Sequence, residues 1–284
     1  MLIIADNLHV VRSDIARAVA DMNPEPIRRL VHSCLRAGAQ AIDVNSGPLP
    51  RKARERMRLL VDAVRSVHRG SLLLDTTNAD AMAAGLAACR GKAIVNGFSL
   101  EPDRIERFLP LAKSFGADII GYLLYPGGRV PVDADDLMQA AVSLFEICIA
   151  AGLPPERLII DPVIAPLSWQ DGLRHNQSVL TLLRHLPDLL GAPVRTIAGL
   201  SNLASGPMPL ERKIALEQAY LPMLAAAGLD MLLVNVWHKP TIETANLSDG
   251  LLGSGVFAWG DVAPGPAPHP EGAMAMSIEH EKER

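Results

Sequence analysis

The sequence lacks an excess of positive charge and any long apolar run. It has 27 Lys and Arg against 31 Asp and Glu, a formal net charge of -4 at pH 7. Proteins that neutralise a phosphate backbone need a basic excess, so nucleic acid is not an expected partner. No apolar run approaches the roughly 18 residues of a membrane span. An acid already stands at Asp6, too early for a signal peptide. We therefore expect a cytoplasmic protein with no membrane partner.

Cysteine is also scarce. The three thiols, Cys34, Cys89 and Cys148, are odd in number and far apart, and each lies in an apolar helical pattern. Disulfide frameworks and cysteine metal sites need cysteines in regular, paired spacing. The pattern therefore predicts three reduced thiols in the core.

The sequence does contain short apolar runs that recur along its length. The runs are continuous rather than alternating, as in the strands of a parallel sheet covered by helices. Eight of them occupy residues 2–5, 41–44, 71–75, 93–95, 118–123, 157–160, 194–198 and 231–234. Helical patterns fill most intervals and are clearest at residues 26–37, 50–68, 79–88, 102–115, 134–151, 177–190 and 210–227.

This alternation predicts an α/β fold, a (β/α)8 TIM barrel built as a single domain. The competing open, doubly wound sheet would usually carry a glycine fingerprint after its first strand, and here that strand is followed by Asp6-Asn7-Leu8-His9. We expect the barrel to span residues 1–262. Residues 263–284, which begin in a Pro- and Gly-rich stretch and end in charges, are expected to form a disordered C-terminal tail.

Polar residues follow the apolar runs, where a barrel places its active site. Seven of the eight predicted strand ends carry Asp or Asn. Each one alone is more often a helix cap or a turn residue, but a ring of them favours a site. Carboxylates and amides with little positive charge suit a neutral, polyfunctional heterocycle such as a pterin or purine. The candidates are Asp6, Asn7, Asp43, Asn45, Asp75, Asn78, Asn96, Asp161, Ser201, Asn202 and Asn235.

Two other chemistries fit this ring less well. Asp43, Asp75 and Asp161 offer oxygen ligands for a divalent cation, yet only His9 and His238 among the histidines follow strand ends, and we expect no metal. Ser201 lacks the glycine pair of a nucleophile elbow, and the cysteines lie in helices. The remaining histidines considered are expected on the solvated surface: His32, His68, His175 and His185.

The strand ends also carry ordered motifs. They are Gly38-Ala39-Gln40-Ala41-Ile42-Asp43-Val44-Asn45, Leu74-Asp75-Thr76-Thr77-Asn78, Ile94-Val95-Asn96, Ile159-Ile160-Asp161-Pro162 and Gly199-Leu200-Ser201-Asn202. Together they resemble the pterin-binding methyltransferase family, from residue 1 to about 255. Within it the chain is most similar to the methyltetrahydrofolate:corrinoid (iron-sulfur protein) methyltransferases, and the dihydropteroate synthases are more distant relatives.

The resemblance implies residue roles. Asp75, Asn96 and Asp161 would hold the ring of tetrahydrofolate or a related reduced pterin, and Asn202 would lie beside the methyl-bearing ring nitrogen. Gly199 and Ser201 would form part of the pocket wall. Asn202, Asp161 and Asp75 are the expected catalytic residues. The expected pocket rim is Asp43, Asn45, Asn78 and Asn235.

It also implies partners. A separate corrinoid-binding protein would supply the cobalt and dock over the barrel mouth, and the enzyme would be a homodimer. The chain departs from the family's pattern at its first strand, which continues into Asp6-Asn7-Leu8-His9. It departs again where a usual Asn-Arg pair is replaced by Glu217-Gln218. These changes leave open the form of the pterin and the identity of the corrinoid partner.

Two alternatives to methyl transfer remain. A dihydropteroate synthase joins a pterin pyrophosphate to an arylamine and usually carries Ser-Arg-Lys after the seventh strand and Arg-x-His after the eighth. This chain has Ser201-Asn202-Leu203 and Val236-Trp237-His238. The other alternative is a non-catalytic pterin-binding subunit of a methyl-transfer complex, which the altered first strand favours.

Overall fold

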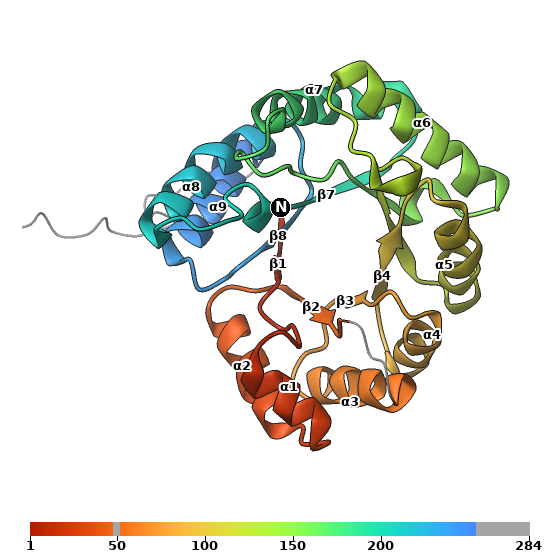
Figure 1. Cartoon of the computed structure of the whole chain (residues 1–284), viewed down its shortest axis with the longest axis vertical. Helices are drawn as coiled ribbons and strands as arrows, with labels where there is room; N and C mark the ends of the chain where they lie inside the picture. Colours follow the sequence, from red (N-terminus) through yellow and green to blue (C-terminus); the bar gives the residue numbers. More distant parts are fainter. Residues whose placement is uncertain (48–51, 254–284) are drawn as a thin grey trace, which may run out of the picture.

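Eight parallel strands close into one barrel (Figure 1), in the computed structural model that describes residues 1–47 and 52–253. Seven of the strands lie within one residue of a predicted apolar run, while β4 continues three residues further, to Phe98. The prediction of a (β/α)8 barrel is therefore confirmed. The strands are β1 Leu2–Ala5, β2 Ala41–Asn45, β3 Leu72–Asp75, β4 Ala93–Phe98, β5 Asp118–Tyr122, β6 Leu158–Asp161, β7 Arg195–Gly199 and β8 Met231–Val234.

The barrel interior holds an apolar plug. Side chains alternate along a strand, so each continuous apolar run supplies both the interior and the outer face that packs on the helices. One buried apolar residue from each strand forms a cluster in the interior, and most of the other buried apolar residues form a larger cluster under the helices. The plug consists of Ile4, Ala41, Leu73, Ile94, Ile120, Ile159, Ile197 and Met231.

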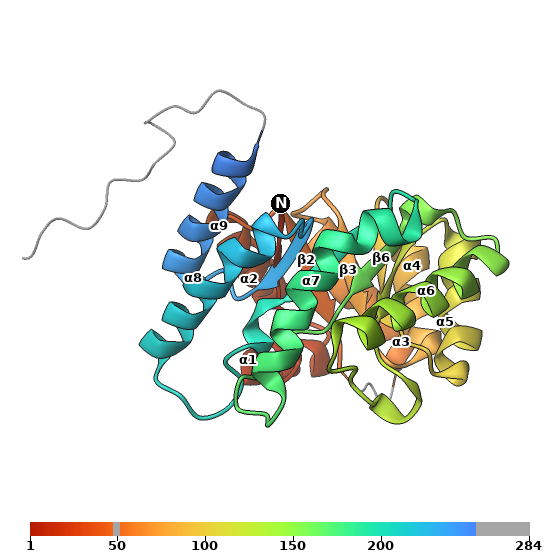
Figure 2. The same cartoon turned by 90° about the horizontal axis from the view of Figure 1, so that it is seen from above.

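Helices surround the strands (Figure 1), and α8 and α9 lie side by side (Figure 2). The apolar pattern singled out neither α1, which is only eight residues long, nor α9, whose polar Thr, Asn and Ser residues leave a weak stripe. The helices are α1 Ser13–Ala20, α2 Glu25–Arg36, α3 Ala53–Arg65, α4 Ala79–Ala88, α5 Pro102–Phe115, α6 Ala134–Ala150, α7 Gly172–Leu190, α8 Leu210–Ala226 and α9 Lys239–Leu252. Short 3-10 turns are η1 Pro126–Gly128, η2 Pro155–Arg157 and η3 Leu200–Asn202.

Close packing of helix on strand depends on one glycine in β5. A Cβ atom added to Gly121 would collide with the side chain of Leu144 on α6, so only glycine lets this helix approach the sheet so closely. The core thiols behave as predicted, because Cys34, Cys89 and Cys148 are all buried and free. Burial raises the pKa of Cys34 to about 11 and that of Cys148 to about 12.

In residues 1–47 and 52–253, no helix is long and apolar enough to cross a membrane. The expected end of the barrel domain at residue 262 and the expected tail at residues 263–284 fall outside the described residues.

Candidate functional site

A polar layer lies directly above the apolar plug, at the carboxyl ends of the strands. Residues two positions apart on a strand face the same way, so the residue two positions after each plug residue also points into the barrel. In β7 and β8 this residue is Gly199 and Leu233, and in the other six strands it is polar. The polar layer consists of Asp6, Asp43, Asp75, Asn96, Tyr122 and Asp161.

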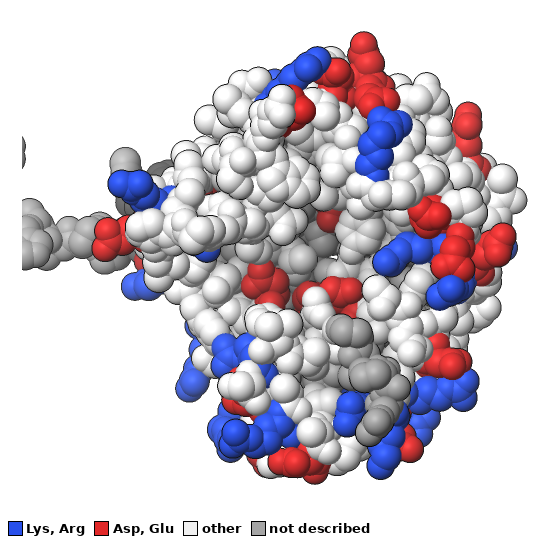
Figure 3. Space-filling view, viewed as in Figure 1, with Lys and Arg blue, Asp and Glu red and all other residues white. Residues whose placement is uncertain are grey.

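Acidic side chains gather in the hollow at the centre of this face (Figure 3). Asp43 is buried at 3% exposure, and within the described residues its Oδ1 has no hydrogen-bond partner. Burial, and then the nearby carboxylates of Asp75 and Asp6, raise the pKa of Asp43 well above its ordinary value of 3.8. Burial and the neighbouring carboxylates therefore favour the protonated form of Asp43.

Asp75 titrates close to neutral pH. Burial raises the pKa of Asp75 to about 6, while the guanidinium of Arg104 and a hydrogen bond from Asn45 act in the opposite direction. The amide nitrogen of Asn45 donates to Asp75 Oδ2 at 2.6 Å. Arg104 lies in the first turn of α5. Arg104 is not a strand-end residue, and it adds one positive charge that acts on the ring.

Asn96 is buried and Tyr122 is partly buried, and the two form a hydrogen-bonded pair on neighbouring strands. The phenol of Tyr122 donates to Asn96 Oδ1. Burial, and then the carboxylates of Asp75, Asp161 and Asp43, raise the pKa of Tyr122 well above 10, so the phenol stays a neutral donor. Because the phenol occupies the Asn96 oxygen, the amide nitrogen is the group that Asn96 can offer a ligand. Tyr122 was not among the predicted site residues, although it is the last residue of β5 and lies within the fifth apolar run.

Asp161 is held by the loop that follows β6. Its Oδ1 accepts from the backbone N–H of Val163 at 2.7 Å, which opposes the effect of burial, and burial still raises the pKa of Asp161 to about 7. Val163 itself adopts a φ of 62°, a left-handed conformation that is unfavourable for a β-branched residue. Its carbonyl oxygen lies 2.6 Å from Nε2 of His175. The loop is thereby anchored beneath the carboxylate.

His175 corrects one expectation. It was placed on the solvated surface, yet it is 1% exposed, and its Nδ1 lies 2.6 Å from the carbonyl oxygen of Pro131. The reason is that α7 begins at Gly172, five residues before the predicted start at 177, which places His175 in the first turn against two loops. His32 and His185 are exposed as expected.

The end of β7 presents Gly199, Ser201 and Asn202. Ser201 and Asn202 lie on η3 and are exposed, and the hydroxyl of Ser201 donates to Asp6 Oδ2 at 2.6 Å. The amide nitrogen of Asn202 lies 3.6 Å from the position that a Cβ atom on Gly199 would take. Within the described residues the Asn202 side chain has no hydrogen-bond partner. Its amide is therefore available at the edge of the hollow.

The remaining rim candidates are already engaged with the protein. Asn235 Oδ1 accepts from Asn7 Nδ2 at 2.7 Å and from the backbone N–H of Trp237 at 3.0 Å, which ties β8 to β1. Asn78 caps α4, because its Oδ1 accepts from the N–H of Ala81 at 3.0 Å. Contact of Asn78 and Asn235 with a ligand stays a prediction.

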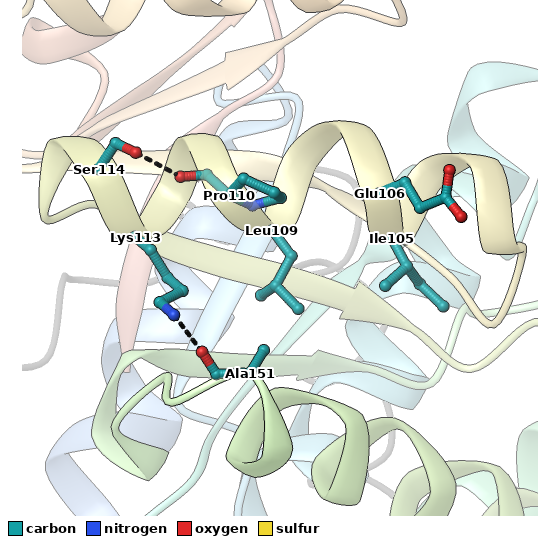
Figure 4. A pocket seen from close by; sticks show the side chains of 7 residues that line it. All are labelled: Ile105, Glu106, Leu109, Pro110, Lys113, Ser114 and Ala151. Carbon is teal, nitrogen blue, oxygen red and sulfur yellow. Dashed lines mark hydrogen bonds between the residues drawn. The ribbon is translucent and has the colours of Figure 1, made fainter.

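Other hollows in the described part of the chain lie away from this face, and two of them show the contrast. A groove of 440 Å³ between α5 and the end of α6 is lined by residues such as Leu109 and Pro110, with the Lys113 ammonium donating to the carbonyl of Ala151 (Figure 4). A cavity of 780 Å³ at the amino ends of the strands is lined by residues such as Asp118 and Arg195. Neither contains a residue of the polar layer, so the mouth is the candidate site.

A known protein family matches most of the chain. Residues 13–235 match the model of a family described as pterin binding enzyme. The chain belongs to the pterin-binding enzyme family. The match runs from α1 through the end of β8 and thus covers every member of the polar layer except Asp6. The family predicted from the strand-end motifs is confirmed.

Curated relatives of this pterin-binding enzyme include methyltransferases. A methylcorrinoid:tetrahydrofolate methyltransferase of Eubacterium limosum is 22% identical over 89% of the chain and 92% of its own length. A methionine synthase of Mycobacterium leprae (strain TN) is 23% identical over 70% of the chain and 17% of its own length.

Solved structures show the same fold. Dihydropteroate synthase of Yersinia pestis, in a complex with a sulfonamide drug, superimposes with a TM-score of 0.66 at 18% identity, over 88% of this chain and 93% of that one. Dihydropteroate synthase of Xanthomonas albilineans, in complex with 7,8-dihydropteroate, superimposes with a TM-score of 0.61 at 19% identity, over 88% and 92%. At such identities the likeness establishes the barrel and not the reaction.

Proposed function

We propose that this pterin-binding enzyme is a methyltransferase, which moves a methyl group between the ring nitrogen of a reduced pterin and the cobalt of a protein-bound corrinoid. The pterin is methyltetrahydrofolate or a close relative. The observation that carries the proposal is Asn202, an exposed amide with no hydrogen-bond partner in the described residues, which follows the carboxyl end of β7 and lies beside Gly199. The similarity to a methylcorrinoid:tetrahydrofolate methyltransferase supports the same reaction.

The polar layer suits the pterin ring. The aminopyrimidinone edge of a pterin presents N–H donors to carboxylates and a carbonyl oxygen to an amide N–H. Asp161 and Asp75 supply the carboxylates, with pKa values raised by burial to about 7 and about 6. Asn96 supplies the amide nitrogen, because Tyr122 holds its oxygen. We assign ring binding to Asp75, Asn96 and Asp161.

Asn202 suits the reacting nitrogen. When the methyl group leaves, the nitrogen retains the electron pair of the broken bond and needs a hydrogen-bond donor or a proton to avoid a full negative charge. A neutral amide can donate to that nitrogen or accept from its proton, and so serves both directions of transfer. The corrinoid, when bound, supplies the cobalt that accepts or returns the methyl group. Gly199 beside Asn202 keeps the wall free of a side chain.

The rim suits a protein partner that carries the corrinoid. Large apolar side chains that follow the carboxyl ends of β1, β6, β7 and β8 are exposed to solvent. Exposed apolar groups around a site mark surfaces where another protein binds. We propose that the corrinoid-binding protein docks here; the residues are Val11, Trp169, Leu173, Met208 and Trp237.

The test combines binding with methyl transfer. Wild-type protein should bind methyltetrahydrofolate and, mixed with cob(I)alamin in a stopped-flow spectrophotometer, should yield methylcobalamin. Asn202→Ala should retain pterin binding and lose roughly 100-fold or more in transfer rate, the cost of removing one donor at developing charge. Asn246→Ala, the same change at an exposed position of α9, is the matched control.

Three other results would contradict the proposed role of Asn202 or the proposed reaction. An unchanged transfer rate in Asn202→Ala would remove the assignment of this residue. Pterin binding without any transfer, in either direction and with protein-bound corrinoid as well, would identify a non-catalytic subunit. Formation of dihydropteroate from a dihydropterin pyrophosphate and p-aminobenzoate would identify a synthase. The homodimer stays a prediction, which light scattering after size-exclusion chromatography measures.

A further inference from the structure

A glycine ends β7, although the barrel itself does not require one there. The described strands contain three glycines, Gly97, Gly121 and Gly199. A Cβ atom on Gly97 would lie 2.6 Å from the carbonyl oxygen of Ile120, and one on Gly121 would collide with a helix side chain, so packing excludes a side chain at both. A Cβ atom on Gly199 would have its nearest contacts in the described chain at 3.6 and 4.0 Å, and the φ of -86° suits any residue.

The open place above Gly199 is bounded by an amide and by an apolar side chain. The amide nitrogen of Asn202 lies 3.6 Å from the position of the added Cβ atom, and Cδ2 of Leu233 lies 4.0 Å from it. Leu233 is the register partner of Gly199 on β8, packs on the apolar plug and is partly exposed. A glycine weakens a strand and often marks a site where a ligand approaches the backbone closely. We call the space between Gly199, Asn202 and Leu233 the Gly199 notch.

The wall of the hollow thus has a polar sector and an apolar sector. Strands β1 to β6 each contribute a polar side chain to the layer above the plug, whereas β7 and β8 contribute Gly199 and Leu233. Since β7 and β8 are neighbours in the barrel and these two residues lie opposite each other, the apolar sector is continuous. A ligand that matches the whole wall therefore has one polar edge and one apolar edge.

A reduced pterin ring has these two edges. Its aminopyrimidinone edge carries the donors and acceptors, and its opposite edge consists of two saturated carbons. One of these carbons is bonded to the nitrogen that carries the methyl group, so the saturated edge lies next to whatever stands beside Asn202. We propose that Gly199 and Leu233 form the seat of this saturated edge and make the site prefer a reduced pterin to an oxidised one.

Room and polarity both favour the reduced ring. Its two saturated carbons are tetrahedral and carry hydrogens above and below the ring plane, whereas the same carbons of an oxidised pterin are planar and need less room. The Gly199 notch supplies the room, and Leu233 supplies apolar contact to the added hydrogens. The seat takes ring carbons and not the transferred methyl group, because cobalt could not reach a methyl group enclosed by the wall.

This inference rests on the proposed function, and its decisive variant is Gly199→Ala. The substitution puts one methyl group into the notch, where the contacts at 3.6 and 4.0 Å accommodate it without strain. The matched control is Gly250→Ala on α9, an exposed position with open space around the added group. The Kd values of tetrahydrofolate, methyltetrahydrofolate and folic acid are measured by anaerobic calorimetry. The three ligands share one tail and differ in ring reduction and methylation.

In Gly199→Ala we expect the Kd of both reduced folates to rise about 10-fold or more, the usual effect of one extra methyl group in a fitted pocket. The Kd of folic acid should change by less than about threefold, and Gly250→Ala should change none of the three by more than about twofold. Unchanged values, or an equal rise for all three ligands, would overturn the proposal. A rise confined to methyltetrahydrofolate would also overturn it, because the notch would then hold the transferred methyl group.

A second pair of variants tests the other half of the seat. Leu233→Asn has nearly the same shape but is polar, and it should lower the preference for tetrahydrofolate over folic acid about 10-fold. Leu233→Met keeps the apolar contact and should restore that preference to within about threefold of wild type. A preference that Leu233→Asn leaves unchanged would refute the role of Leu233, and Gly199→Ala decides the proposal if Leu233→Asn does not fold.

These binding measurements involve no corrinoid, so the two proposals can fail separately. If wild-type protein transfers no methyl group but Gly199→Ala selectively weakens binding of the reduced folates, the proposed function fails and the seat stands. If wild-type protein transfers methyl groups and Gly199→Ala binds all three ligands as wild type does, the seat fails and the proposed function stands.

Discussion

Replacing Asp161 by Asn should stabilise the unliganded protein and weaken its affinity for the pterin. Burial raises the pKa of Asp161 from the ordinary 3.8 to about 7. A charged Asp161 above neutral pH therefore raises the free energy of the folded state. The cost is absent below the unfolded pKa, grows as the pH rises, and is complete above pH 7. The difference of about three pH units, at about 1.4 kcal/mol each, sets an upper value of roughly 4 kcal/mol.

Asp161 is partly exposed, which lowers the expected gain of Asp161→Asn at pH 8 to roughly 2–4 kcal/mol. The Asn oxygen can still accept from Val163 N–H, so the loop keeps its anchor. Urea unfolding at pH 8 and pH 4.5, without pterin, measures the free energy of unfolding. Asp62→Asn on the exposed face of α3 serves as the control and should change little at either pH.

The binding of methyltetrahydrofolate should change in the opposite direction. An amide in place of the carboxylate loses charge-assisted hydrogen bonds worth about 1.5–3 kcal/mol, which is roughly a 10- to 100-fold rise in Kd by calorimetry at pH 8. Wild-type affinity should also fall as the pH drops below about 7, and Asp161→Asn should show a flatter profile. A variant that is less stable than wild type at both pH values, or one that binds pterin as tightly, would refute this account of Asp161.

Two further predictions concern neighbouring elements. Tyr122→Phe removes the phenol hydroxyl that donates to Asn96, so the Asn96 amide loses its fixed orientation. The Kd for pterin should therefore rise about 5- to 10-fold in the same calorimetric titration. An unchanged Kd would show that Tyr122 does not orient Asn96. Phe108 on α5 is only 1% exposed, so Phe108→Ala should leave a cavity in the core. Urea unfolding should show that the free energy of unfolding falls by about 3–5 kcal/mol. A fall below about 1 kcal/mol would mean that α5 moves to fill the cavity.

Local pattern was enough to predict the barrel and much of its polar layer. An apolar residue that enters the interior and the polar residue above it are only two positions apart in the chain, as in Leu73 and Asp75 or Ile159 and Asp161. Strand alternation then places both on the same face without reference to any distant residue. Tyr122 obeys the same rule and was overlooked only because it is neither Asp nor Asn.

What the sequence could not determine depends on pairs that are far apart in the chain. Asp6 and Ser201 are 195 residues apart, so only closure of the barrel brings them within hydrogen-bond distance. Glu217 and His238 are 21 residues apart, and they meet because α8 packs beside the segment that follows β8. The surface assignment of His175 was wrong for a similar reason, because its partners lie on loops after β5 and β6.

Ionisation belongs wholly to the tertiary structure. The sequence shows Asp43, Asp75 and Asp161 as three equivalent acids, but burial and neighbouring charges give them different pKa values: that of Asp43 lies well above its ordinary value, that of Asp75 is about 6 and that of Asp161 is about 7. The sequence by itself thus determined which side chains enter the mouth, since strand periodicity is local. Only the folded barrel decided which of them carry charge, because desolvation and Coulomb interactions depend on distances that the chain order does not contain.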